Sequence, residues 1–283
     1  MKFAKMQGTG NDYIYVNCFE ETVFDPPAAA KFLSDRHFGV GSDGLVLIEP
    51  SDRADFKMDI YNSDGSRARM CGNAARCVAK YVCDNGLTDK SLISLETPGG
   101  IKYLDIYKEN GKVVSARVNM GAPILKSRDI PALFDSDTVI DLPLKVGAKS
   151  YRVTCLSMGN PHCVVFSNDA DSVNIQKTGP EFENHPAFPD RINTEFVQPL
   201  SGSRIKMRVW ERGAGETLSC GTGACAAAAA CILNGYCKRD TDITVTLRGG
   251  ELSVNWSADG AVYLTGPAVT VFTGKIACFG GAR

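Results

Sequence analysis

The sequence predicts an α+β fold of two pseudo-symmetric lobes, each a curved, mainly antiparallel sheet wrapped around a central helix. Three observations lead to this fold: a repeat at one fixed offset, short strand segments that outnumber helices, and one apolar helix in each repeat. The 283 residues, 44% hydrophobic and 22% charged, suffice for one large core or two modest ones.

The repeat places similar residues 149 positions apart. Chance matches would scatter over many offsets, so one constant register favours duplication over coincidence. The clearest pairs are Lys57-Met58 with Lys206-Met207, Cys71-Gly72 with Cys220-Gly221, and Gly10-Asn11 with Gly159-Asn160. We therefore expect an N-terminal lobe at 1–117, to which 266–283 returns, and a C-terminal lobe at 118–265.

The first lobe contains short segments rich in Val, Ile and Tyr, which are typical of strands. Asn110-Gly111 separates the last two segments and indicates a hairpin. Helices are expected over 26–36 and directly after Cys71, where Asn85-Gly86 ends the second helix. The predicted strands lie at 13–16, 44–48, 57–61, 101–107 and 113–118.

The second lobe follows the same order. Its helix starts after Cys220 and ends at Asn234-Gly235, and its Ala-rich sequence is apolar on every side. Such a helix is stable only when its sheet covers it on all sides. Strands are predicted within 151–166, 204–210, 242–256 and 260–272.

The charge balance disfavours two classes of partner, nucleic acids and anionic membranes. Lys and Arg total 31 against 32 Asp and Glu, so no basic surplus favours nucleic acid or an anionic membrane surface. The longest apolar run, at 224–233, is too short to span a bilayer. The N-terminal segment lacks the apolar stretch of a secretory signal, so we expect a cytoplasmic protein with a small-molecule ligand.

Eleven cysteines are many for such a chain. In a reducing compartment thiols serve as core residues, metal ligands or catalysts. Cys71, Cys77 and Cys83 are six residues apart, a spacing that puts them on different faces of a helix, and no Cys-x2-Cys pair occurs. We therefore expect no metal site, and we interpret nine of the cysteines as core residues.

Cys71 and Cys220 are the two exceptions. Each precedes a predicted buried helix and a glycine, where unpaired N–H groups bind carboxylates and are expected to lower a thiol pKa. If the lobes face each other across a cleft, the two sulfurs flank one carbon from opposite sides. One thiol can then remove a proton while the other delivers one, which is the chemistry of inversion without a cofactor.

Six motifs extend this hypothesis: GTGNDYIYVN, DRHFGVGSDGLV, YNSDGSRARMCGNAARC, MGNPHCVVF, INTEFV and VWERGAGETLSCGTGACAAA. With them, residues 8 to about 230 resemble the diaminopimelate epimerase family in sequence and order. The resemblance implies a cofactor-independent isomerase that converts LL-2,6-diaminopimelate to meso-diaminopimelate in lysine and peptidoglycan precursor biosynthesis. It also implies two similar lobes with a substrate cleft between them, and a homodimer.

The resemblance assigns roles by motif position. Cys71 and Cys220 match the catalytic acid/base pair, and Gly72, Asn73, Gly221 and Thr222 match the segments that hold the reacting carboxylate. His162 and Glu211 match groups that tune the thiol pKa. The remaining substrate contacts are expected at Asn11, Asn62, Asn160, Asn193, Glu211 and Arg212, a set that suits a second charged amino-acid head.

Two positions depart from the family pattern. Gly44 stands where some members have a glutamine that contacts substrate, so a side-chain contact is expected to be lost to water. Ala74 stands where glycine is frequent.

Three alternatives remain open. A proline-type racemase or an epimerase of a different amino acid shares the two-thiol chemistry, but a proline-type substrate lacks the second charged head that Arg212, Glu211 and Asn193 suit. A phenazine-type isomerase shares the fold without the cysteine pair. A thiol-rich redox or metal-binding protein is the alternative from another class.

Overall fold

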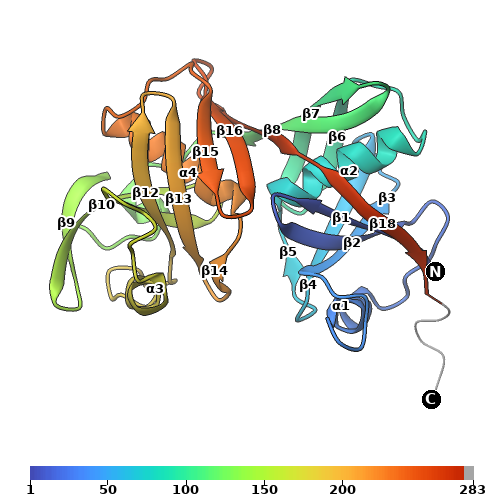
Figure 1. Ribbon diagram of the computed structural model, residues 1–283, viewed down its shortest axis with the longest axis horizontal. Coiled ribbons are helices and arrows are strands. Elements are labelled where there is room, and N and C mark those ends of the chain that lie inside the picture. Colours follow the sequence, from blue (N-terminus) through green and yellow to red (C-terminus); the bar gives the residue numbers. More distant parts are fainter. Residues whose placement is uncertain (277–283) are drawn as a thin grey trace. The chain divides into compact units, whose positions relative to one another are not determined.

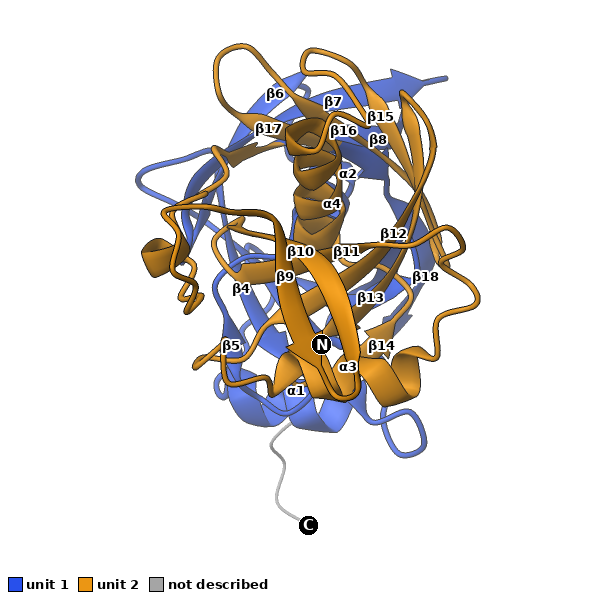
Figure 2. Cartoon of the chain, turned by 90° about the vertical axis from the view of Figure 1, so that its left-hand side faces the viewer, with its two compact units in different colours: residues 1–118, 265–283 blue, residues 119–264 orange. Residues whose placement is uncertain are grey.

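The computed structural model describes residues 1–276. Contacts divide the chain into unit 1, Met1–Val118 together with the chain from Thr265 onward, and unit 2, Asn119–Leu264 (Figure 2). The expected lobes were 1–117 with 266–283, and 118–265. The last part of that expected return, residues 277–283, lies outside the described residues.

The described part of unit 1 contains the helices α1 and α2 (Figure 1). Its elements are β1 (Lys2–Gly8), β2 (Asn11–Asn17), α1 (Pro26–Ser34), β3 (Gly44–Glu49), β4 (Phe56–Asn62), β5 (Arg67–Ala68), α2 (Gly72–Asp84), β6 (Leu92–Thr97), β7 (Gly100–Glu109), β8 (Lys112–Gly121) and β18 (Val269–Lys275). Asn110 and Gly111 both have positive φ, so they form the β7–β8 hairpin turn that the sequence predicts.

Most strand pairs in unit 1 are antiparallel: β18–β1, β1–β2, β3–β4, β4–β5, β6–β7 and β7–β8. Two pairs are parallel, β2–β3 and β4–β6, and their connections contain α1 and α2. A parallel pair requires a long crossover, and these helices provide it. The prediction of mainly antiparallel sheets is confirmed, with these parallel links added.

Unit 2 repeats this plan. Its elements are the 3-10 helix η1 (Ser127–Asp129), β9 (Val139–Val146), β10 (Lys149–Ser157), β11 (Pro161–Phe166), α3 (Ile175–Glu183), β12 (Asn193–Ser201), β13 (Arg204–Glu211), β14 (Gly215–Thr217), α4 (Gly221–Leu233), β15 (Ile243–Leu247), β16 (Gly250–Trp256) and β17 (Val262–Pro267). The parallel pairs are β11–β12 and β13–β15, the counterparts of β2–β3 and β4–β6.

The duplication is therefore visible in structure as well as sequence. Helices α2 and α4 have the same length of 13 residues and start 149 residues apart. The parallel pair of unit 1 aligns Tyr13 with Gly44, and that of unit 2 aligns His162 with Asn193, again 149 residues later. One register thus governs both sheets, and the fold predicted from the repeat is confirmed.

The central helices are buried as expected. Residues Ala224 to Cys231 of α4 are fully inaccessible, and the helix contacts β10 to β13 as well as β15 and β16. A sheet that touches one helix with so many strands curves around it, and small alanine side chains permit this close approach. Helix α2 likewise contacts β1, β2, β7 and β18.

Two local predictions need correction. Helix α1 ends at Ser34, two residues before the expected end. Helix α3 was not predicted, because Pro180 lies inside it and Pro normally interrupts helices. Its Asn174 side chain caps the first turn by accepting from the Lys177 N–H group at 3.3 Å. Across residues 1–276, no helix combines the length and the apolar character needed to cross a membrane.

Candidate active site

The two predicted thiols occupy equivalent positions. Cys71 is the N-cap of α2 and Cys220 is the N-cap of α4. Each sulfur accepts a hydrogen bond from the third helical residue, from the Ala74 N–H at 3.5 Å and from the Gly223 N–H at 3.4 Å. Gly72-Asn73 and Gly221-Thr222 form the first turns, whose N–H groups carry the positive end of the helix dipole.

In unit 1, Asn11 connects the sulfur to its surroundings. Cys71 Sγ donates to Asn11 Oδ1 at 3.4 Å, and Asn73 Nδ2 donates to the same oxygen at 3.3 Å. Asn11 Nδ2 donates to Asp43 Oδ2 at 2.8 Å. The fully buried Arg76 donates to Asn73 Oδ1 at 2.8 Å. Asn11, Cys71 and Asn73, three predicted site residues, therefore lie together in unit 1.

In unit 2, the matching asparagine is Asn160. Its Nδ2 donates to Thr222 Oγ1 at 3.2 Å, and Thr222 Oγ1 lies 3.5 Å from Cys220 Sγ. His162 Nε2 lies 3.0 Å from Asn160 Oδ1. Four residues that the sequence singled out, namely Asn160, His162, Thr222 and Cys220, thus form one continuous chain of contacts.

Glu195 completes this chain and was missed. It is fully buried, and its Oε1 lies 2.7 Å from Nδ1 of the equally buried His162. Burial raises the Glu195 pKa, as does the charge of Glu211, while His162 opposes this rise. Glu195 is the charged residue of the INTEFV motif, and this was a sequence signal, since a carboxylate buried in a strand requires a partner.

The Cys220 pKa contradicts the expectation for a helix start. Burial raises it well above the ordinary thiol value, and the charges of Glu211 and Glu195 raise it further. Hydrogen bonds from Thr222 and the Gly223 N–H act in the opposite direction but do not prevail. The expected lowering is therefore wrong for Cys220, because desolvation outweighs the hydrogen bonds that the sulfur receives.

Asn193, Glu211 and Arg212 lie together where β12 begins and β13 ends. Asn193 is buried, accepts from the Arg212 main-chain N–H at 3.0 Å and donates to the Pro161 carbonyl at 2.7 Å. Thr217 Oγ1 donates to Glu211 Oε1 at 2.5 Å. The exposed Arg212 guanidinium donates to the Asp190 carbonyl at 2.9 Å. Asn193 thus holds the main chain that carries both charged side chains.

Asn62 and Gly44 are aligned across β3 and β4 in unit 1. Asn62 Nδ2 donates to Ser66 Oγ at 3.0 Å. A Cβ atom at residue 44 would overlap the Tyr61 carbonyl oxygen and crowd the Tyr13 ring. Glycine is therefore needed here for close approach of the two strands. The sequence pattern predicted only a lost substrate contact at Gly44 and not this steric requirement.

The other cysteines are mostly interior. Cys77, Cys155, Cys163, Cys225, Cys231 and Cys237 are buried, and Cys18 and Cys83 are partly buried. Cys278 lies outside the described residues. In the described part of the chain, no group of three His, Cys, Asp or Glu side chains has an arrangement suited to a metal ion.

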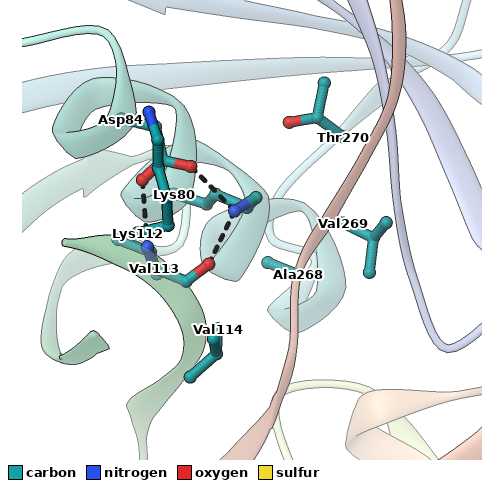
Figure 3. Close-up of a pocket in the computed structure, with 8 residues that line it drawn as sticks. All are labelled: Lys80, Asp84, Lys112, Val113, Val114, Ala268, Val269 and Thr270. Carbon is teal, nitrogen blue, oxygen red and sulfur yellow. Dashed lines mark hydrogen bonds and ion pairs between the residues drawn. The ribbon is translucent and has the colours of Figure 1, made fainter. Parts of the chain in front are cut away.

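Unit 1 also contains an open pocket of about 390 Å³, lined by residues of α2, β8 and β18 that include Lys80 and Asp84 (Figure 3). Lys80 lies nine residues after Cys71, roughly 13 Å of helix rise. The Lys80 ammonium donates to Asp84 at 2.7 Å and to the Val113 carbonyl at 2.6 Å. These contacts join α2 to β8, so the pocket's lysine has a structural role.

The family comparison agrees with the motif analysis. The model of the family described as "Diaminopimelate epimerase" matches residues 3–126 and 154–271. Curated relatives named diaminopimelate epimerase include one from Acetivibrio thermocellus, 55% identical over 98% of each chain. Another, from Methanococcus maripaludis, is 54% identical over 98% of this chain and 99% of the relative.

Solved structures share the fold at low identity. A phenazine biosynthesis protein of the PhzF family from Bacillus anthracis is 16% identical over 98% of this chain and 99% of that chain, with a TM-score of 0.72. A hydroxyproline epimerase from Agrobacterium vitis is 16% identical over 98% of this chain and 90% of that chain, with a TM-score of 0.68. At this identity the likeness shows the fold alone.

Proposed function

Because the chain belongs to the diaminopimelate epimerase family, we propose that it epimerises LL-2,6-diaminopimelate to meso-diaminopimelate without a cofactor, in lysine and peptidoglycan precursor biosynthesis. One observation carries the proposal of mechanism: Cys71 and Cys220 are N-caps at matching positions of the two repeats. Two equivalent thiols beside two helix starts suit an acid and a base that act on one stereocentre.

In the proposed reaction, one sulfur acts as thiolate and removes the α-proton. The C–H electron pair moves toward the substrate carboxylate, and the thiol of the other cysteine delivers its proton to the opposite face of the carbon. The two sulfurs end with exchanged protonation states, and proton exchange with water restores them. The reverse reaction uses the same groups in exchanged roles. The raised Cys220 pKa favours its thiol form, which suits the proton donor.

The starts of α2 and α4 are proposed to stabilise the negative charge that develops on the substrate. First-turn N–H groups at Gly72-Asn73 and Gly221-Thr222 are proposed to bind the reacting carboxylate, where negative charge develops. Arg212 is proposed to pair with the distal carboxylate and Glu211 with the distal ammonium. Asn11, Asn62, Asn160 and Asn193 are proposed as further substrate contacts, and His162 and Glu211 as groups that tune the thiols.

A turnover experiment in deuterated water tests this mechanism. The product should carry solvent deuterium at the inverted carbon, and Cys71→Ala or Cys220→Ala should each reduce epimerisation by about 10²–10⁴-fold. Cys83→Ala is the matched control, because Cys83 lies on α2 outside the first turn. Near-full activity of either active-site variant, or product without deuterium, would contradict the mechanism.

The substrate is tested by a parallel assay. Turnover of proline alone would contradict the named substrate and favour the proline-type alternative. Tightly bound zinc without exchange of an α-hydrogen would favour the metal-binding alternative.

We also propose a cytoplasmic homodimer. The ten described cysteines are free thiols, the state that a reducing compartment maintains. Strand β18 presents Val269, Val271 and Phe272 with 42%, 54% and 45% of each residue exposed, an apolar surface that a second copy would cover. Light scattering of the purified chain should give twice 30.4 kDa, and Phe272→Glu should weaken the dimer. A monomer at micromolar concentration would contradict this proposal.

A further inference from the structure

The buried pair His162–Glu195 exists in only one of the two repeats. The residues 149 positions earlier are Tyr13 and Val46, neither of which is charged at neutral pH. Both His162 and Glu195 are fully inaccessible, and Glu195 Oε2 has no hydrogen-bond partner among residues 1–276. Such a carboxylate is costly to bury, so a role at this place in the fold is expected.

The contacts of His162 fix its hydrogens. Nε2 faces Asn160 Oδ1, which only accepts, so Nε2 carries a hydrogen. One further proton lies between Nδ1 and Glu195 Oε1. With its oxygen facing His162, Asn160 must direct its NH2 group at Thr222 Oγ1. The Thr222 hydroxyl hydrogen is then available to the Cys220 sulfur, 3.5 Å away.

Asn11, the matching asparagine in unit 1, has the opposite amide orientation: its oxygen, not its NH2 group, faces the cysteine side. Asn11 directs its NH2 group at the Asp43 carboxylate, and its oxygen accepts from Cys71 Sγ. Both sulfurs accept from a helix N–H, but the Cys71 sulfur also faces an acceptor, whereas the Cys220 sulfur faces the Thr222 hydroxyl. The two repeats place their thiols in different hydrogen-bonding environments.

We propose that Glu195 is a positioning residue that anchors the His162 ring, so that His162 and Asn160 hold the Thr222 hydroxyl as a donor to Cys220. The ring has one hydrogen bond on each nitrogen, and the Glu195 bond is the shorter of the two. Its loss would leave the ring held from one side only. This inference takes one point from the proposed function, namely that Cys220 is a catalytic thiol.

Several titratable groups face this network. Glu195 lies near His162 and Cys163 on β11, Glu211 on β13 and Cys220 at the start of α4. Removing the Glu195 charge alone therefore lowers the Cys220 pKa, whereas losing the Thr222 hydrogen bond raises it. The two effects have opposite signs, so they can be separated by paired variants.

The pair is Glu195→Gln, which removes the charge but keeps a hydrogen-bonding group, and Glu195→Leu, which removes both. The rate of alkylation of Cys220 by iodoacetamide is measured against pH, with mass spectrometry of the peptides, in protein whose folding is checked by circular dichroism. We expect the pH midpoint of Cys220 alkylation to be higher in Glu195→Leu than in Glu195→Gln by about half to one pH unit. Cys71, in the same molecules, should be unchanged. Equal Cys220 midpoints, or equal shifts at Cys71, would overturn the proposal.

Thr222 provides the second test. Thr222→Val should raise the Cys220 midpoint, Thr222→Ser should not, and in the Val background the two Glu195 variants should no longer differ. A Thr222→Val midpoint equal to wild type would overturn the proposal even if Glu195→Leu fails to fold. Turnover should follow: kcat/KM falls about tenfold or more in Glu195→Leu and by less than about threefold in Glu195→Gln. Because alkylation is independent of turnover, this test can fail while the proposed epimerase activity stands, and the reverse.

Discussion

Gly223 and Glu195 approach each other so closely that a Cβ atom at residue 223 would stand 2.7 Å from Glu195 Oε1. The same atom would lie 3.3 Å from Cys220 Sγ. The first turn of α4 therefore touches both the candidate catalytic sulfur and the buried carboxylate. In unit 1 the corresponding residues are Ala74 and Val46, so an alanine at the helix start accompanies an apolar strand residue.

Gly223→Ala should reduce activity and stability together. The added methyl group must displace Glu195 or Cys220, and overpacking of this kind costs about 1–3 kcal/mol. Urea unfolding and kcat/KM are the measurements. Gly202→Ala is the control, because a Cβ there meets no atom within 4 Å. Wild-type kcat/KM in Gly223→Ala would show that the contact is unimportant.

Gly44→Ala should destabilise unit 1, since the new Cβ overlaps the Tyr61 carbonyl oxygen on the neighbouring strand. We expect a loss of about 1–3 kcal/mol in the free energy of unfolding. Gly44→Gln, which adds a longer side chain, should be tolerated no better. A stable, fully active Gly44→Gln enzyme would refute the steric explanation.

Glu183→Gln should destabilise unit 2 by about 1–3 kcal/mol. The Glu183 carboxylate accepts from Trp210 Nε1 at 2.7 Å, from the Gly213 N–H at 2.8 Å and from Arg191 at 3.0 Å. An amide cannot accept all three, because its NH2 group faces a donor. Arg191→Ala is the comparison and should cost less than about 1 kcal/mol, since the Arg191 side chain is 54% exposed. Equal losses in the two variants would contradict this account.

Asp84→Asn should make the free energy of unfolding less dependent on pH in the acidic range. Partial burial opposes ionisation of Asp84, but hydrogen bonds from Lys80 and the Val113 N–H prevail and lower its pKa. A lowered pKa stabilises the fold above the unfolded-state value and loses that effect as the pH falls through the folded-state value. The difference in free energy of unfolding between wild type and Asp84→Asn should therefore be full at about pH 6 and shrink below about pH 4. A difference between wild type and Asp84→Asn that stays constant across this pH range would disprove the link.

Much of the fold follows from local sequence signals. The Asn-Gly pairs end α2 and α4 where expected, with Gly86 and Gly235 at positive φ. The Asn110-Gly111 turn forms its hairpin. The sequence did not predict helix α3, because Pro180 lies inside it. This helix is stabilised by tertiary contacts with β12, β13 and β14.

The amino-acid sequence alone determined the duplicated architecture, because the repeat is visible as one constant offset. It also determined that Cys71 and Cys220 lie at two helix starts, because helix capping and turn formation depend on neighbouring residues. Only the tertiary structure decided what surrounds those sulfurs. Glu195 meets His162 through the parallel alignment of β11 and β12, and the raised Cys220 pKa results from burial together with the charges of Glu211 and Glu195. Desolvation and long-range pairing depend on atoms distant in sequence, so no local pattern specifies them.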